Sequence, residues 1–505
     1  MSNNHLIFKN TIYLYLRQIS VLVVALFTTR IILNVLGVED FGLYNLIAGV
    51  VSLLTIVTSS LTSSTQRFLA ISLGKENDEE FKTIFDVCFT LFVVISLVVI
   101  ILGETIGLWF LNTELIIPHG REFAANCTYQ LAVMAFVFNL IRVPYNAAII
   151  SHEKMDFYAW ISIFQVSGQL LIAYCVYFIK YDHLITYSLL HVGVTLLINF
   201  VYIIYCRKRL DVKLHRLSFN RQYFDQIFSF SFWTFFGALS SIGTRQGINI
   251  LINRFFGVRL NAASSVSTKV SGAAYDFVAN FTTAYRPQIL KLYAKGENEE
   301  LYTLISLTTR LSCFLFAAIM LPLLINVDSL LSLWLGDVPE YANSFCILLM
   351  IYLFIDALQS PLIVLVHAIG DIKRFQLTFS TINTLNLPVM WYFLHIGCNP
   401  NSIYICFIVF NIFTSLYRII YVKKRSNLSI RHYLMVIFRI ITTLSFCYFI
   451  AYSFDSFVVE VDNWLTLLWQ SAVIFVLTLL TILIVGVDKN ERLKLKKILI
   501  QKKHK

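Results

Sequence analysis

Three arginines, Arg30, Arg142 and Arg245, stand inside long, mostly apolar stretches of this sequence. A charge inside a membrane-spanning segment is costly and usually faces a cavity or a partner. The planar guanidinium suits phosphate groups in particular, because its fork donates two parallel hydrogen bonds. We therefore interpret these residues as candidate ligands of a phosphate-type anion in an internal cavity.

Acidic residues within the same kind of segment offer a different interpretation. Glu104, Asp276 and Asp356 lie inside predicted spans, and Asp86 lies near the edge of one. The arginines could pair with these carboxylates between helices, for example Arg245 with Asp276. Glu104, Asp276 and Asp356 are also the candidates for a counter-ion role or for coupling to Na⁺ or H⁺. The sequence leaves both interpretations open.

The other basic residues within predicted spans lie nearer the span ends. Arg17, Arg310, Arg418 and Arg439 lie within about two turns of an inner end, and we expect them to extend to the headgroups. Arg254 and Lys269 lie near the outer ends of adjacent spans, where the same explanation applies.

The composition is that of a protein with many membrane spans. Of 505 residues, 58% are hydrophobic and only 14% are charged, whereas a soluble domain is nearer a quarter charged. The nine cysteines form no C-x-x-C pair, which argues against a disulfide framework or a zinc site. No HExxH, GxSxG or P-loop motif occurs, so we predict neither an enzyme nor a bound cofactor. No cleavable signal peptide is recognisable.

About 20 apolar residues span a bilayer, and this rule predicts an all-α protein with about fourteen transmembrane helices. The predicted spans are 12–36, 40–65, 84–110, 122–147, 157–179, 184–206, 225–256, 260–285, 301–325, 340–366, 374–395, 401–421, 432–454 and 463–486. We divide the chain into an N-lobe (1–206), a cytoplasmic linker (207–224), a C-lobe (225–421), two additional spans (422–487) and a basic tail (488–505).

An internal repeat supports the two lobes. Moving the sequence by 220 positions carries Gly37 onto Gly257 and Lys75 onto Lys295. Each copy contains an apolar helix, a glycine turn, a second helix rich in Ser and Thr, and a segment that reads GKEN or KGEN. A repeat must be found before the fold is assigned, because overlooking it leads to the wrong fold.

Two prolines extend the repeat. Pro144 and Pro361 lie 217 positions apart, each inside an apolar helix that a charged turn follows. Paired halves with proline-interrupted helices are typical of transporters whose site lies between the halves. We predict that both prolines allow their helices to bend during gating.

The distribution of basic residues predicts the orientation. Only Arg121, Lys180 and Arg259 fall in predicted outer segments, whereas the inner segments and the tail hold most of the 40 Lys and Arg residues. The positive-inside rule then places both termini in the cytoplasm. The net charge of +11 therefore reflects orientation and contact with anionic lipid, and it does not indicate nucleic-acid binding.

Small hydroxyl residues are concentrated in the second helix of each repeat. They are Ser59, Ser60, Thr62, Ser63, Ser64 and Thr65 in one copy and Ser264, Ser265, Ser267, Thr268 and Ser271 in the other. Such residues let helices approach closely and form hydrogen bonds. We favour this packing role over the alternative, which is contact with a sugar.

Several segments resemble those of a known family. TTRIILNVLGVEDFGLYNLIAG, TQRFLAISLGKEN and FFGVRLNAASSVSTKVSGAAYDFVANFTTAYRPQILKLYAKGE are similar to the polysaccharide-exporter branch of the multidrug/oligosaccharidyl-lipid/polysaccharide (MOP) superfamily. More narrowly, the chain resembles Wzx-type O-antigen translocases and related capsule flippases of Gram-negative bacteria. The resemblance extends over essentially the whole chain and implies a fold similar to that of the MATE transporters.

The resemblance also implies a function and partners. Such proteins move an undecaprenyl-diphosphate-linked oligosaccharide from the cytoplasmic to the periplasmic leaflet of the inner membrane by alternating access. Polysaccharide polymerases and other assembly proteins are the implied protein partners. The alternative within the superfamily is a cation-coupled multidrug exporter, whose first span usually carries an acid, whereas the first span here carries Arg17 and Arg30. A scramblase or scaffold is disfavoured by the duplicated proline helices, and a polymerase by the short outer segments.

Overall fold

The computed structural model describes residues 3–52, 55–113, 117, 120–217, 219–426, 428–456 and 463–486. Every regular element in these ranges is a helix, and they contain no strand. This confirms the predicted all-α membrane fold, and ten of the described helices are long and apolar enough to cross a bilayer. The basic tail at 488–505 lies outside the described residues.

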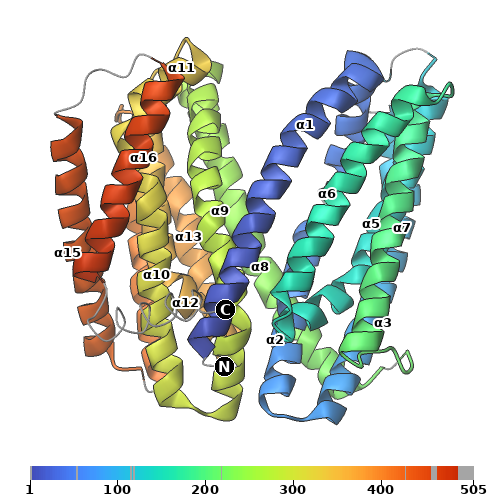
Figure 1. The fold of residues 1–505 in the computed structure, drawn as a ribbon, viewed down its shortest axis with the longest axis horizontal. Helices are drawn as coiled ribbons and strands as arrows, with labels where there is room; N and C mark the ends of the chain where they lie inside the picture. Colours follow the sequence, from blue (N-terminus) through green and yellow to red (C-terminus); the bar gives the residue numbers. More distant parts are fainter. Residues whose placement is uncertain are drawn as a thin grey trace, which may run out of the picture. The chain divides into compact units, whose positions relative to one another are not determined.

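The helices divide between two compact units (Figure 1). Unit 1 comprises residues 1–238 and 284–297, and unit 2 comprises residues 239–283 and 298–505. The helices up to the linker are α1 (Asn3–Ser52), α2 (Thr55–Gly74), α3 (Asp78–Leu102), the π-helical η1 (Gly103–Gly107), α4 (Leu108–Thr113), α5 (Glu122–Ser151), α6 (Met155–Phe178) and α7 (His183–Arg209).

The second series of helices follows the linker. It comprises α8 (Arg221–Phe256), α9 (Val258–Lys295), α10 (Asn298–Ile325), α11 (Val327–Leu335), α12 (Ala342–Ile369), α13 (Ile372–His395), α14 (Asn401–Arg425), α15 (Ile430–Asp455), α16 (Trp464–Thr481) and the π-helical η2 (Ile482–Gly486). The short α11 was not predicted, because nine residues fall below the length that a span requires.

The backbone reproduces the internal repeat. Gly37 interrupts α1 with φ of 76°, and Gly257 separates α8 from α9 with φ of 80°. A positive φ is adopted most readily by glycine, so both copies use glycine where one apolar helix turns into the next. The first two predicted spans therefore lie on either side of Gly37, as the 220-residue repeat requires.

Each unit has its own apolar core. In unit 1, Phe85 and Phe92 on α3 are fully buried, and Tyr145 on α5 contacts Phe85 edge to face at 5.3 Å. In unit 2, Phe316 on α10 and Phe345 on α12 are fully buried. α3 packs against α5, and α5 against α7, within unit 1 (Figure 1).

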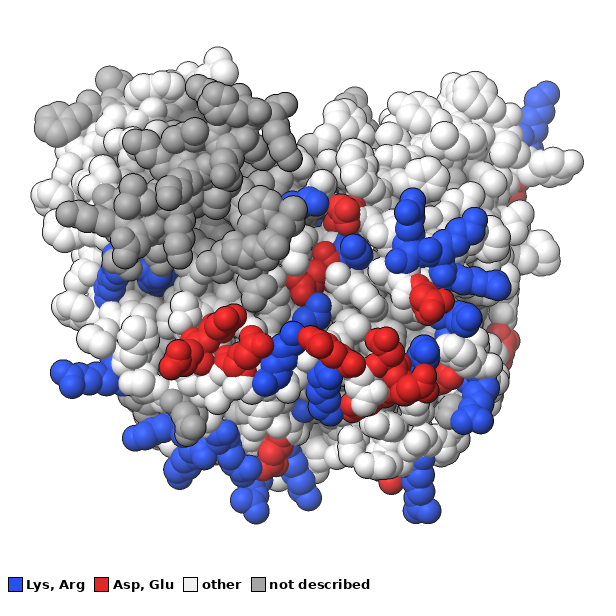
Figure 2. All heavy atoms as spheres, turned by 60° about the horizontal axis from the view of Figure 1, so that its bottom comes forward, with Lys and Arg blue, Asp and Glu red and all other residues white. Residues whose placement is uncertain are grey.

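Charged side chains gather at one end of the helices. Figure 2 looks onto the face at the bottom of Figure 1, where Lys and Arg lie among Asp and Glu. The turn between α2 and α3 lies on this side of unit 1 (Figure 1), and the sequence predicts that this turn is cytoplasmic. We call this the inner end and the opposite one the outer end.

Candidate functional site

Arg245 on α8 is exposed, and it makes no hydrogen bond or ion pair with the described residues. It lies 12 positions before Gly257, which at 1.5 Å per residue is about 18 Å along the helix from the outer turn. That depth is about half of a bilayer core of about 30 Å. An unpaired cation at such a depth must face water or a ligand, because lipid would not solvate it.

Lys269 and Asp276 on α9 are two further exposed charged residues of unit 2. Lys269 lies 12 positions after Gly257, so it is as far from the outer turn as Arg245. Both side chains are exposed and form no hydrogen bond or ion pair within the described part of the chain. The predicted Arg245–Asp276 pair is therefore not formed. The equal spacing favours a place for Lys269 beside Arg245 over the headgroup contact that we expected.

The remaining hydroxyls of α9 mainly pack helices together. Ser264 Oγ lies 2.8 Å from the Tyr404 hydroxyl on α14, and Ser267 Oγ donates to the Ala342 carbonyl of α12 at 3.0 Å. In unit 1, Ser64 Oγ donates to the Ile227 carbonyl of α8 at 3.3 Å. These contacts support the packing role that the sequence favoured.

Arg142 is the second candidate, and it lies in unit 1 without a carboxylate partner among the described residues. Its Nη1 donates to Gln165 Oε1 on α6 at 3.3 Å, and its guanidinium lies 5.3 Å from the ring centre of Tyr202 on α7. The side chain is half-buried. It is held in place by neutral groups, so its positive charge is not neutralised. Arg30 lies on α1, but its side chain is outside the described part of the structure.

Asp356 on α12 is half-buried and belongs to a polar cluster in unit 2. The Tyr275 hydroxyl of α9 donates to its carboxylate, and Arg418 of α14 lies within electrostatic reach of it. Arg418 is only 4% exposed and donates to Gln359 Oε1. The expectation that Arg418 reaches the headgroups is wrong, because Gln359 and the aromatic rings of α13 hold the guanidinium inside the unit.

The other predicted residues lie in less distinctive places. Glu104 is exposed on the π-helical turn η1 and accepts a hydrogen bond from Gln130 at 3.0 Å. Pro144 and Pro361 are buried in α5 and α12, and both helices continue past them. Among the described residues, no group of three His, Cys, Asp or Glu side chains is placed to hold a metal ion.

Two cavities lack the cations that a phosphate needs. In unit 1, a cavity of about 180 Å³ is lined by Tyr44, Thr128, Asn139, Ser188, His191 and apolar residues. At the outer end of unit 2, a pocket of about 480 Å³ is lined by Glu340, Asn343, Ser344, Asn401 and their neighbours. Neither lining contains Lys or Arg, so these cavities suit water or neutral groups and not an anion.

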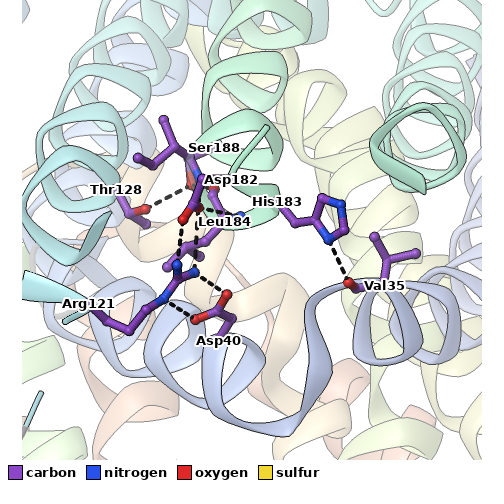
Figure 3. Close-up of polar contacts among 9 residues, drawn as sticks. Val35, Asp40, Arg121, Thr128, Asp182, His183, Leu184 and Ser188 are labelled. Atoms are coloured by element: carbon purple, nitrogen blue, oxygen red, sulfur yellow. Dashed lines mark hydrogen bonds and ion pairs between the residues drawn. The ribbon is translucent and has the colours of Figure 1, made fainter. Parts of the chain in front are cut away.

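Arg121 forms ion pairs at the outer end of unit 1 that sequence reasoning did not identify (Figure 3). Its guanidinium pairs with Asp40 of α1 and with Asp182, which also caps α7 by accepting from the Leu184 and Ile185 amides at 3.1 Å. Burial raises the pKa of Asp182, but the bonds from these amides and from Arg121 outweigh it and hold the pKa below its usual value. The sequence places Arg121 and Asp182 in predicted outer segments and Asp40 at the outer end of a predicted span.

Comparison with known proteins identifies the family. The sequence profile of the family described as polysaccharide biosynthesis protein matches residues 7–295, more than half of the chain. The chain belongs to this polysaccharide biosynthesis family. No curated protein matches its sequence at a significant level.

Solved structures show that this member of the polysaccharide biosynthesis family has the MATE fold. A MATE transporter in complex with MaL6 aligns with a TM-score of 0.69 at 12% identity over 88% of this chain and 98% of its own. An outward-facing multidrug resistance MATE transporter of the MOP superfamily gives 0.69 at 11% identity, covering 84% and 98%. A MOP transporter from Pyrococcus furiosus, described as having a binding pocket of reverse polarity, gives 0.68 at 12% identity, covering 88% and 97%.

Family and fold together identify a multi-pass membrane transporter of the MOP superfamily. Nothing in either points to catalysis. The family name also connects the transporter with polysaccharide synthesis. The chemistry of its substrate must be inferred from its own residues.

Proposed function

We propose that this transporter moves an undecaprenyl-diphosphate-linked oligosaccharide from the cytoplasmic to the periplasmic leaflet of a bacterial inner membrane. The observation that carries the proposal is the exposed, unpaired Arg245 at about half the bilayer depth, with Lys269 level with it on α9. Cations so placed attract an anion into a cavity. The family name supplies the link to a saccharide.

The arginines bind the diphosphate, and the polyprenyl chain stays in lipid. Arg142 is held by Gln165 and Tyr202, both neutral, so its charge remains available to the ligand. With Arg30 and Arg245 it replaces the water that the diphosphate loses on entering the cavity. The two halves alternate between inward and outward states around this site, and the helices bend at Pro144 and Pro361.

Substitution of the arginines tests the proposal in a strain that lacks its own copy of the gene. Arg245→Ala, Arg142→Ala and Arg30→Ala each abolish surface polysaccharide while the protein stays in the membrane. Lysine at these positions retains partial function, because charge is kept and fork geometry is lost. Arg254→Ala is the matched control, since Arg254 is also exposed on α8 but lies near the outer end. Full surface polysaccharide in all three alanine variants would contradict the proposal.

A second candidate is a cation-coupled multidrug exporter. The exposed and unpaired Asp276 favours it, because an organic cation seeks such a carboxylate. The similar structures include a multidrug resistance transporter, although that likeness shows the fold alone. Ethidium accumulation decides between the candidates: a decrease on expression that Asp276→Asn abolishes would support the exporter.

Coupling to Na⁺ or H⁺ is compatible with either function. Asp276 and Asp356 are the candidate ion sites within unit 2, and Glu104 is the candidate in unit 1. Asp356 already accepts from Tyr275, whereas the Asp276 carboxylate has no hydrogen-bond or ion-pair partner among the described residues. A Na⁺ gradient that stimulates transport by wild type but not by Asp276→Asn would assign the ion to Asp276.

A further inference from the structure

The inner end of α9 folds with the unit opposite to the rest of the helix. Residues 258–283 belong to unit 2, and residues 284–297 belong to unit 1. Pro287 lies inside α9 just after this change. Proline has no amide hydrogen, so the carbonyl of Thr283, four residues earlier, lacks its usual helical partner. The helix is therefore weakest where it passes from one unit to the other.

A close helix contact holds this end of α9 in unit 1. A side chain on Gly74, the last residue of α2, would place its Cβ 2.8 Å from Lys291 Cα and 2.9 Å from Ala294 Cβ. Gly74 and Ala294 are equivalent in the 220-residue repeat. The two copies of the same helix end therefore pack directly against each other, and this packing requires glycine on one side.

Two glutamates elsewhere in unit 1 bind the same helix end. Glu153, after α5, accepts from Lys291 Nζ at 2.6 Å and from Gln288 Nε2 at 2.9 Å. Glu76, after α2, accepts from Lys295 Nζ at 2.9 Å. The Glu153 side chain is 8% exposed and that of Glu76 is 77% exposed, so Glu153 is the stronger anchor.

Both glutamates have a backbone conformation that favours glycine. Their φ angles are 60° at Glu153 and 56° at Glu76. The equivalent positions in the second repeat are Gly370 and Gly296, with φ of 85° and 72°. A residue with a Cβ is strained in this region. At both positions the first repeat carries glutamate and the second carries glycine, and both glutamates bind the end of α9.

We propose that residues 284–297 form an inner clamp that closes the cytoplasmic side of the transporter. Thr283–Pro287 is its hinge, and Glu153 is its principal latch, with Glu76 as a weaker one. Release of Lys291 and Lys295 lets the end of α9 leave unit 1, so that the inner side opens for loading. This inference rests on the alternating access of the proposed function, but it names residues that contact no substrate.

Cross-linking of the full-length protein in membranes tests the clamp without a substrate. Cysteines replace Glu76 and Lys295, the exposed Cys175 becomes Ser, and a protease site is inserted at the exposed Leu217 in the linker. A short bis-methanethiosulfonate reagent forms a disulfide with each cysteine and releases methanesulfinate, and it keeps the two fragments together after proteolysis only where the clamp is closed. Each single cysteine serves as a control for the gel assay.

Charge reversal at the latch supplies the decisive comparison. Glu153→Lys and Lys291→Glu each reduce the cross-linking yield at least threefold, and the double exchange restores it to at least half. Glu79→Lys leaves the yield unchanged, because the Glu79–Lys82 pair lies within α3 and does not touch α9. An unchanged yield in both single variants, or a double exchange no better than either, would overturn the proposal.

The transport readout separates this proposal from the preceding one. The cross-linked protein loses flipping of a fluorescent undecaprenyl-diphosphate oligosaccharide in proteoliposomes and regains it after reduction. Full flipping while cross-linked would overturn the clamp. A different result would be the expected cross-linking yields together with no flipping of this lipid, even by wild type. That result would uphold the clamp and contradict the proposed cargo.

Discussion

Arg142 in unit 1 and Arg418 in unit 2 make similar contacts, with a glutamine and with aromatic rings, but they differ in burial. Arg142 of α5 is bound by Gln165 of α6 and by a ring of α7, and it is half-buried. Arg418 of α14 is bound by Gln359 of α12 and by rings of α13, and it is 4% exposed. The helices correspond in the repeat, and Gln359 lies at the position equivalent to Arg142, 217 residues on.

The difference lies in what surrounds each guanidinium. Asp356 lies within electrostatic reach of Arg418, whereas no carboxylate contacts Arg142 among the described residues. A cation buried as deeply as Arg418 is out of reach of a ligand, and its removal would leave buried polar groups without their partner. A half-exposed cation that is held by neutral groups keeps that capacity. We therefore expect Arg418 to have a structural role, whereas the proposed function assigns Arg142 a role in ligand binding.

The largest expected effect on stability is at Arg418. Arg418→Ala removes a buried cation and leaves buried Gln359 without its hydrogen-bond donor, so we expect it to destabilise the protein by about 3 kcal/mol. Thermal unfolding of the purified protein, followed by size-exclusion chromatography, measures the loss. Arg418→Lys should fall between wild type and alanine, because it keeps the charge without the fork. A melting temperature equal to that of wild type in Arg418→Ala would remove the structural half of the comparison.

The opposite pattern is expected for Arg142. Arg142→Ala should reduce flipping of a fluorescent undecaprenyl-diphosphate oligosaccharide about 100-fold, the effect of removing one preorganised ligand of an anion. Its unfolding should change by only about 1 kcal/mol, because the lost contacts are one cation–π contact and one hydrogen bond. If Arg142→Ala proved as unstable as Arg418→Ala, the two arginines would not differ in role.

An intermediate effect is expected where unit 1 has an ion-pair group of its own. Arg121→Gln leaves Asp40 and Asp182 without their shared cation, and it should destabilise the protein by about 2 kcal/mol. Flipping at low temperature should be retained, since this group lies at the outer end and away from the candidate site. Thermal unfolding measures the loss, and Lys180→Gln is the matched control. Lys180 is a nearby basic residue that forms no ion pair with the described residues.

The smallest effect is in the dependence on pH. The pKa of Asp182 is held below its usual value of about 3.9, so this carboxylate adds stability above that pH and loses it as the pH falls through the lower, folded-state value. Asp182→Asn should therefore reduce the difference in melting temperature between pH 6 and pH 3. An identical pH profile in wild type and Asp182→Asn would show that the pair with Arg121 does not control the titration.

Much of the fold could be predicted from the sequence, because span length and repeated glycines are strong local signals. Gly37 and Gly257 marked the same turn in both copies, and the structure gives both a positive φ. The role of Arg418 could not be predicted, because burial depends on which face of α14 meets α12 and α13. Its distance from the helix end alone suggested headgroup contact.

The candidate site was predicted less completely than the fold. Arg245 and Asp276 were identified from their depth, but their lack of partners required side-chain positions. Pro287 was not singled out, because in sequence it marks only the end of a span. Its importance depends on residues 284–297 folding with the other unit, which no local pattern records.

Reconstituted flipping by wild type, Arg245→Ala and Arg254→Ala tests the central claim most directly. Proteoliposomes contain a fluorescent undecaprenyl-diphosphate oligosaccharide, and dithionite quenching measures its transfer between leaflets. We predict rapid transfer by wild type and Arg254→Ala, and transfer at least 100-fold slower by Arg245→Ala. Equal transfer by all three proteins would contradict a binding role for Arg245.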